Sequence, residues 1–188
     1  MSLLVNFLMF QMAWFACVLG GAHQLPWVGP AMVAVVVAVH LGRVPDARAE
    51  SALLVIAAVI GAVFDSALVS TGWLVYPSGQ MASYLAPYWI VAMWVAFATT
   101  LNVSLHWLKR RPVLAAVFGG VGGPLAFLAG AKLGAVTFVD PVSGYAALAV
   151  GWAVLMPLLM AVAVRLDGWR PGVGGRVLAS TAGGSGDV

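Results

Sequence analysis

Long apolar stretches follow one another along the chain, separated by short polar breaks. Six of them have the length of a membrane span, at approximately residues 3–22, 25–42, 51–73, 86–107, 113–136 and 144–164. The hydrocarbon layer of a bilayer is about 30 Å thick, so a helix rising about 1.5 Å per residue needs about 20 residues to cross it. Strands of a transmembrane barrel would alternate apolar and polar residues, and these stretches do not. The pattern therefore predicts an all-α fold, a polytopic membrane bundle of six transmembrane helices.

The basic residues are confined almost entirely to alternate breaks between these stretches. With the N-terminus in the cytoplasm, the cytoplasmic segments would be residues 43–50, 108–112 and 165–188. Eight of the nine Lys and Arg residues fall in these segments: Arg43, Arg48, Lys109, Arg110, Arg111, Arg165, Arg170 and Arg176. Because positive charge is retained on the cytoplasmic side of a membrane, the predicted topology is N-in and C-in.

The composition favours the same class of protein. Hydrophobic residues make up 63% of the chain and charged residues only 8%, whereas a soluble domain has roughly 25% charged residues. This excludes a soluble globular fold, a disordered chain and a nucleic-acid binder. Residues 1–170 are interpreted as a single transmembrane domain, and residues 171–188, which are rich in glycine and serine, as a poorly ordered cytoplasmic tail.

Metal and cofactor chemistry receives no support from the sequence. The single cysteine, Cys17, excludes a disulfide framework and a cysteine-based metal site. His23, His40 and His106 lie near the ends of different predicted spans, without a third ligand or an E-x-x-H pairing. We interpret them as interfacial side chains, and we predict neither a metal nor a cofactor.

Asp65 is the most informative residue, because it lies well inside the third predicted span. An acidic side chain at that depth costs about 2.5–3.5 kcal/mol on insertion scales and usually faces protein or water. Ala58, Gly61 and Ala62 precede it at helical spacing, and small residues mark a face that packs against other helices. We expect the carboxyl group to point inward. It would be either a ligand-binding, proton-accepting or catalytic group, or a hydrogen-bonding link between two helices.

Lys132, in the fifth predicted span, is a candidate partner for Asp65. It lies close to the outer interface, where its ammonium could instead extend to water, so an ion pair and a snorkelling side chain are both open. Nearly opposite Lys132, the same span carries a seam of small residues: Gly119, Gly123, Ala126, Gly130 and Gly134. This glycine seam is typical of close helix packing. The alternatives are a glycine-lined ligand cleft and a contact face for a partner membrane protein.

Polar residues also occur in the first and fourth predicted spans. Tyr88, Thr99, Asn102 and His106 share one helical face, while Asn6 and Gln11 in the first span need partners in lipid. Hydrogen bonding between helices is the ordinary explanation for such residues, and a continuous polar cavity is the alternative.

The tryptophans fall into two groups. Trp27, Trp73, Trp89, Trp107 and Trp169 lie near span ends, where aromatic side chains anchor a protein at the membrane interface. Trp14, Trp94 and Trp152 lie deeper, where they either fill the core or line a pocket for a flat or acyl ligand. The candidate ligand-binding residues are Asp65, Lys132, Tyr88, Trp89, Trp14, Gln11, Trp94 and Asn102.

Several of these positions belong to a wider set of motifs. The set consists of Asn6, Phe10-Gln11, Trp14-Phe15-Ala16-Cys17, Asp65, Pro87-Tyr88-Trp89, Gly122-Gly123-Pro124-Leu125-Ala126, Gly130 and Leu133-Gly134-Ala135. Over most of residues 4–165 the chain resembles an uncharacterised family of small bacterial inner-membrane proteins. The resemblance implies a multi-pass protein of the inner membrane, and it assigns no catalytic role to any residue because the family has no established activity. Members of that family look associated with genes for fatty-acyl modification, of the cyclopropane fatty acid synthase type, which favours a lipid ligand.

Three functional hypotheses compete on these grounds. In the first, the protein binds or helps to modify a membrane lipid or small amphiphile in a cavity near Asp65, which would be the candidate acid or base of an enzyme. In the second, it is a transport component, because six spans within 188 residues are similar to the substrate-binding subunits of energy-coupling-factor importers. In the third, it has a structural or assembly role, with the glycine seam packed against a partner membrane protein.

Overall fold

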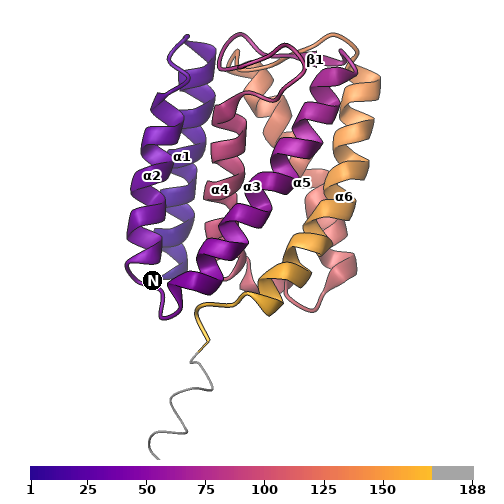
Figure 1. Ribbon diagram of the computed structural model, residues 1–188. Coiled ribbons are helices and arrows are strands. Elements are labelled where there is room, and N and C mark those ends of the chain that lie inside the picture. Colours follow the sequence, from indigo (N-terminus) through magenta and orange to yellow (C-terminus); the bar gives the residue numbers. More distant parts are fainter. Residues whose placement is uncertain (171–188) are drawn as a thin grey trace, which may run out of the picture.

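The computed structural model describes residues 1–170, so the predicted tail lies outside the described residues. Its helices are α1 (Leu3–Ala22), α2 (Val28–Leu41), α3 (Ala47–Ser70), α4 (Tyr88–Leu101), α5 (Pro112–Lys132) and α6 (Pro141–Arg165). A short 3-10 helix, His106–Leu108, precedes α5, and two short strands, β1 (Leu74–Val75) and β2 (Thr137–Phe138), lie in the loops. The prediction of an α-helical bundle is confirmed (Figure 1).

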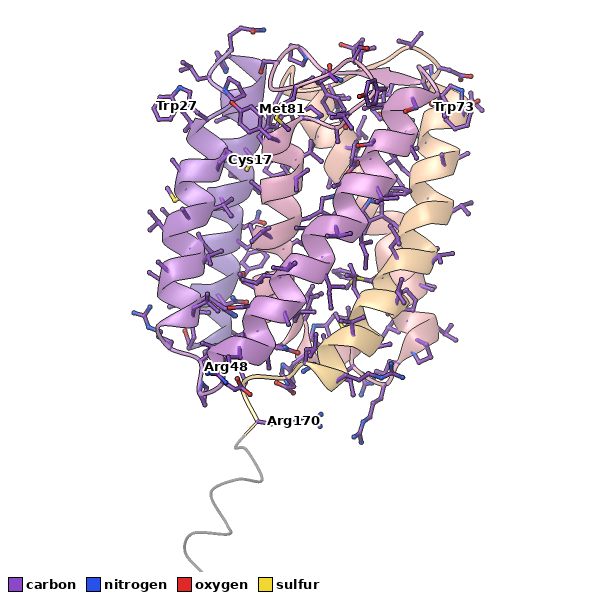
Figure 2. The ribbon with its side chains drawn as sticks, in the orientation of Figure 1. Cys17, Trp27, Arg48, Trp73, Met81 and Arg170 are labelled. Carbon is purple, nitrogen blue, oxygen red and sulfur yellow. The ribbon has the colours of Figure 1, made fainter. Side chains whose placement is uncertain are left out.

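Helices α1, α2 and α3 are arranged around α4. Helices α1 and α2 pack side by side and both contact α4, while α3 packs on α4 and α5 pairs with α6 (Figure 1). Arg48 and Arg170 lie at one end of the bundle, together with the N-terminus (Figures 1 and 2). We call this the basic end. Trp27 and Trp73 lie at the opposite end, which also holds β1 and which we call the strand end (Figure 2).

Four of the helices are long and apolar enough to cross a membrane: α1, α3, α5 and α6. Helices α2 and α4 have 14 residues each, which corresponds to about 21 Å of helix. By length and composition, four helices rather than the predicted six therefore indicate a membrane protein.

The outer surface of the bundle is apolar over whole helical faces. Large apolar side chains are exposed at four-residue spacing on α3 and again on α6: Val55, Val59 and Val63, then Val150, Val154 and Leu158. Soluble monomers rarely expose continuous apolar patches of this kind, because they would associate through them. Such stripes are suited to contact with lipid chains.

Helix α4 is shorter than the sequence predicts, because the span expected at residues 86–107 ends as a helix at Leu101. The side chain of Asn6 on α1 donates to the Thr99 carbonyl at 3.1 Å and accepts from the Ser104 amide at 3.2 Å. In a continued helix the Thr99 carbonyl and the Ser104 amide would bond to backbone groups of the same helix. The two bonds to Asn6 replace those helical bonds. Residues after Leu101 therefore form turns, and Asn6 obtains its partners from backbone groups of this neighbouring segment.

The loops at the strand end are joined by a two-residue antiparallel pairing. Leu74 pairs with Phe138, and Val75 pairs with Thr137. The loop between α3 and α4 is thereby tied to the loop between α5 and α6. This pairing fixes the positions of the residues that flank it, Tyr76 and Val136.

Candidate functional site

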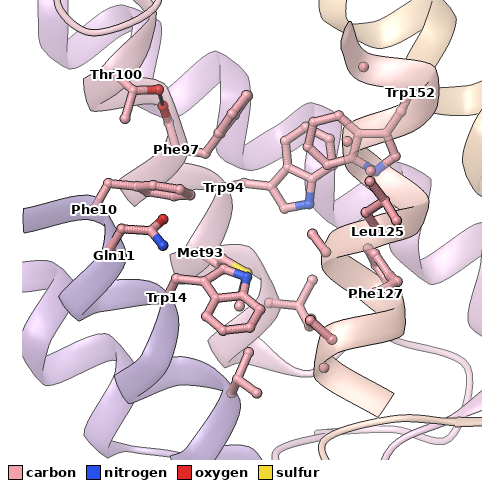
Figure 3. A pocket seen from close by; sticks show the side chains of 18 of the residues that line it. Phe10, Gln11, Trp14, Met93, Trp94, Phe97, Thr100, Leu125, Phe127 and Trp152 are labelled. Atoms are coloured by element: carbon pink, nitrogen blue, oxygen red, sulfur yellow. Dashed lines mark hydrogen bonds between the residues drawn. The ribbon is translucent and has the colours of Figure 1, made fainter. Parts of the chain in front are cut away.

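A cavity of about 560 Å³ lies between α1, α4, α5 and α6, with one residue of α3, Asp65, in its wall. Figure 3 shows Phe10 and Trp14 of α1 on one side, and Leu125, Phe127 and Trp152 on the opposite side. Most of the lining is aromatic or aliphatic. The volume is within the range of about 300–1,000 Å³ that is typical of small-molecule sites.

The cavity opens on the side of the bundle, between α1 and α5. Phe7, Phe118 and Leu125 line it, although Phe7 is 49% exposed and Leu125 is 56% exposed. Residues that both line a cavity and reach the outer surface mark its mouth. Because this surface is apolar, the cavity is accessible to molecules that reach it from a lipid environment.

Asp65 is 1% exposed and is directed into the bundle, as its small neighbours predict. Its Oδ2 atom accepts a hydrogen bond of 2.6 Å from the indole Nε1 of Trp94. Its Oδ1 atom is buried and has no partner among the described residues. A buried carboxyl oxygen without a partner is costly, so this atom is available to a ligand.

Trp94 is held in place by two contacts. A side-chain carbon at Gly61 would collide with its ring, so only glycine at this position of α3 lets the indole lie against the helix. On its other side, Trp94 stacks with Trp152 of α6, with ring centroids 4.6 Å apart and planes at 10°. The face of small residues predicted around Asp65 therefore leaves room for the Trp94 indole, which binds the Asp65 carboxyl group.

Tyr76 is a cavity residue that the sequence analysis did not identify. It follows β1 directly, is buried, and lines the cavity together with Asp65. Its ring meets Trp89 edge to face, with centroids 5.6 Å apart, and its hydroxyl has no partner within residues 1–170. Burial raises the pKa of the Tyr76 hydroxyl well above its usual range, and the Asp65 carboxylate raises it further. The hydroxyl therefore remains protonated.

The structure brings five of the eight candidate ligand-binding residues together at the cavity: Gln11, Trp14, Asp65, Trp89 and Trp94. Trp89 is only 1% exposed and donates its Nε1 to the Ser78 carbonyl, so its interpretation as an interfacial anchor is wrong. Tyr88 faces away from this lining although it is adjacent to Trp89 in the chain, because successive helical residues point in different directions.

Lys132 does not join this site. It is the last residue of α5 and is exposed, and within the described part of the chain it forms no ion pair with Asp65. Of the two arrangements left open by the sequence, the structure shows the side chain at the surface. Asp65 therefore has no cationic partner among the described residues.

The glycine seam is covered by α6 of the same chain. A side-chain carbon at Gly119 or at Gly123 would collide with Trp152. Both glycines also line the cavity. The seam thus provides close helix packing and part of the cavity wall, and the face formed by these two glycines is occupied within the chain.

A second buried polar cluster lies at the basic end. Glu50 is fully buried and accepts bonds from His40 Nε2 at 2.9 Å, Asn102 Nδ2 at 2.6 Å and the Gly168 amide at 3.2 Å. Asn102 therefore belongs to this cluster rather than to the cavity. The sequence predicts Glu50 in the break between two helices and His40 as an interfacial side chain, whereas Glu50 lies in α3 and both side chains are fully buried.

Helix α3 begins earlier than predicted, at Ala47, and this explains the buried position of Glu50. Asp46 caps the helix by accepting from the amides of Arg48 and Ala49, each at 3.1 Å. Capping at Asp46 places Glu50 within the first turn of α3, facing inward. The cluster joins α2 and α3 to the segments that follow α4 and α6, and so stabilises the basic end.

Comparison with known proteins gives one match. The sequence profile of a family described as "Protein of unknown function (DUF2878)" matches residues 3–158, which is more than half of the chain. No curated protein matches the chain, and no solved structure does. The match confirms the resemblance to a family without an assigned function.

Proposed function

Because the chain belongs to the DUF2878 family of proteins of unknown function, we propose its function from the cavity. In this proposal the protein is a membrane protein that binds a lipid or small amphiphile, with the apolar part of the ligand lying between α1 and α5. The observation that carries the proposal is the cavity of about 560 Å³ that opens through an apolar surface and contains a single, incompletely bonded carboxyl group.

The shape of the cavity favours an elongated ligand. On α1 the lining residues extend from Phe7 near the basic end to Val18 near the strand end, which is about 16 Å along a helix axis. The walls along this length are largely aromatic, and aromatic side chains bury large apolar areas against a ligand. An acyl or alkyl chain fits this length and this chemistry.

Access from the side distinguishes this site from one that serves a water-soluble substrate. The exposed lining residues Phe7, Phe118 and Leu125 surround the mouth with apolar surface. A molecule dissolved in the bilayer would reach the cavity without crossing a polar layer.

We infer further that all six helices lie in the bacterial inner membrane, with the basic end in the cytoplasm. Helices α2 and α4 are short but run beside α1 through the bundle (Figure 1), and Arg48 and Arg170 lie at the same end (Figure 2). With Cys17 replaced by alanine, a membrane-impermeant maleimide should label Ser83→Cys in intact cells. It should label Arg110→Cys only after permeabilisation. Labelling in the reverse order would contradict this topology.

The binding proposal is tested by filling the cavity from a position that tolerates a larger side chain. Gly122 of α5 lines the cavity, and a side-chain carbon there would meet no described atom within 4 Å. Gly122→Phe should therefore place a ring in open space without disturbing the helix packing. Val121→Phe is the matched control, because Val121 is exposed and does not line the cavity.

The measurement is mass spectrometry of molecules that co-purify with the full chain. We expect one class of amphiphile, in a fixed ratio to protein, with the wild type and with Val121→Phe, and much less of it with Gly122→Phe. Identical bound molecules in identical amounts in all three proteins would contradict binding in this cavity.

A further inference from the structure

The cavity has an electrostatic character that specifies the head group of its occupant. We propose that the ligand is a lipophilic amine, whose protonated nitrogen binds between Asp65 Oδ1 and the Tyr76 hydroxyl while its apolar body extends toward Phe7. This inference rests on the proposed function, because it identifies the chemical class of the molecule bound in the same cavity.

The charge of the cavity lining favours a cationic ligand. Asp65 is the one ionisable acid among the residues that line the cavity, and none of these lining residues is Lys, Arg or His. The ion pairs within residues 1–170 involve the carboxylates of Glu50 and Asp167 but not that of Asp65. A buried carboxylate is costly unless a cation pairs with it. A cationic ligand would provide that partner, whereas an anionic one would add a second uncompensated charge.

The unpartnered hydrogen-bonding groups of the cavity also favour an amine. Trp94 satisfies Oδ2 of Asp65 at 2.6 Å, and the other oxygen, Oδ1, is buried and unpartnered. The Tyr76 hydroxyl, which also lines the cavity, is buried and unpartnered as well. A protonated amine carries up to three donors and no acceptor. It would donate to Asp65 Oδ1 and to the Tyr76 hydroxyl oxygen. Because it has no acceptor, none would be left without a partner.

Aromatic rings surround the Asp65 carboxyl group. Tyr76 and Trp89 meet edge to face with centroids 5.6 Å apart, and Trp94 contacts the carboxyl group directly. Rings of this kind attract a cation over their faces, with tryptophan the most effective. A carboxylate combined with several aromatic rings is a suitable environment for an alkylammonium group.

The position of the head group follows from the fold. Asp65 lies five residues before the end of α3 at Ser70, and Tyr76 follows β1 at the strand end. The rest of the cavity continues toward Phe7 and Phe118, near the opposite end. The amine would therefore lie near the strand end and the alkyl chain would extend toward the basic end.

One lining group favours a different ligand. The indole N–H of Trp152 is buried without a partner among the described residues, and it would bind an acceptor oxygen. For this reason an alkyl carboxylate is the appropriate opposing probe. An alkyl alcohol of the same length is the neutral reference.

The experiment compares dodecylamine, dodecanol and dodecanoate for binding to the full chain in phosphatidylcholine nanodiscs at neutral pH, with empty nanodiscs as the partition control. Removing one partner of a buried charge pair commonly weakens binding affinity by about tenfold or more. We therefore expect dodecylamine to bind at least about tenfold more tightly than the other two, and Asp65→Asn to abolish that preference. Tyr76→Phe should weaken dodecylamine by several-fold.

Matched variants control for structural effects. Asp140→Asn makes the same change at an acid outside the cavity and keeps a side chain able to cap α6. Tyr84→Phe removes a hydroxyl from an exposed tyrosine. Both should bind dodecylamine like the wild type. Retained binding of dodecanol by Asp65→Asn would show that this variant is folded.

The outcomes separate this inference from the proposed function. If dodecanoate binds the wild type as tightly as dodecylamine or more tightly, or if Asp65→Asn leaves a dodecylamine preference in place, the amine assignment is wrong while the cavity still binds amphiphiles. If none of the three compounds binds more than to empty nanodiscs, the proposed function itself is contradicted.

Discussion

Trp94 and Asp65 form a buried pair in which the indole Nε1 donates to Oδ2 at 2.6 Å and leaves Oδ1 free. The two residues come from adjacent helices, α4 and α3, and both line the cavity. The bond orients the carboxyl group so that its unpaired oxygen is the one available to a ligand. The same interaction thus links the packing of α3 on α4 to the chemistry of the cavity.

Trp94→Phe should destabilise the protein while keeping an aromatic ring at this position. The variant leaves Oδ2 of Asp65 buried without its donor, which costs about 1–3 kcal/mol for an unsatisfied polar group. The measurement is the midpoint of thermal unfolding in detergent, which we expect to fall. Trp27→Phe is the control, because Trp27 is 61% exposed and its replacement should leave the midpoint unchanged. Equal midpoints for the two variants would argue against a structural role for the bond.

Gly61→Ala should displace Trp94 from Asp65. The added methyl group would collide with the indole ring, and overpacking of this kind typically costs about 1–3 kcal/mol. Gly122→Ala is the control, since the space beside Gly122 is open and alanine is the better helix former by about 1 kcal/mol. We expect a lower free energy of unfolding for Gly61→Ala and an unchanged or higher one for Gly122→Ala. The reverse order would contradict the packing described for Trp94.

Glu50→Ala should destabilise the basic end of the bundle. The variant removes the acceptor of bonds from His40, Asn102 and the Gly168 amide, and breaking a buried pair of this kind costs about 3–5 kcal/mol. Hydrogen exchange of the Gly168 amide should become faster. Glu50→Gln keeps an acceptor oxygen and should lose less protection. If the two variants exchange at the same rate, the hydrogen bonds of Glu50 do not hold this segment.

Asp140 should make the stability of the protein depend on pH. Its carboxylate accepts from the hydroxyl and the amide of Ser143, which lowers the pKa of Asp140 below the usual value for an aspartate side chain. A group whose pKa is lower in the folded state contributes stability above its unfolded pKa and loses it as pH falls through the folded pKa. Ser143→Ala removes the hydroxyl donor and brings the folded pKa of Asp140 closer to its unfolded value, so the loss of stability in acid should be smaller and should be complete at a higher pH. Thermal unfolding midpoints measured from neutral pH down to acid test this, and superimposable curves for wild type and variant would contradict it.

The inward orientation of Asp65 could be predicted because its cause lies in the local sequence. Gly61 and its small neighbours share a helical face with Asp65, and small faces pack inward in membrane helices. Helical periodicity carries this information without knowledge of the neighbouring helices. The depth of Trp14, Trp94 and Trp152 within their spans left core filling and pocket lining open, and the structure places all three in the cavity lining.

The end of α4 could not be predicted in the same way. Residues 102–107 continue the apolar and polar pattern of the helix, but Asn6, which is remote in sequence, binds the Thr99 carbonyl and the Ser104 amide. A tertiary contact therefore determines where the helix ends. The helix propensity of residues 102–107 does not indicate this tertiary contact.

Tyr76 and Glu50 were missed for related reasons. Tyr76 reaches the cavity because β1 pairs with β2, and a pairing of two residues leaves no periodic pattern in the sequence. Glu50 lies among charged residues and looks like part of a loop. Only the cap at Asp46 and its contacts with His40 and Asn102 make it a buried helical residue.

The space between α1 and α5 is the proposed binding site, and a structure of the full chain extracted with its native lipids tests this most directly. The prediction is elongated non-protein density in the cavity, with one end at Asp65 Oδ1 and Tyr76 and the other near Phe7. Closure of α1 onto α5, with aromatic side chains filling the space and Asp65 bonded to a side chain of the protein, would contradict it.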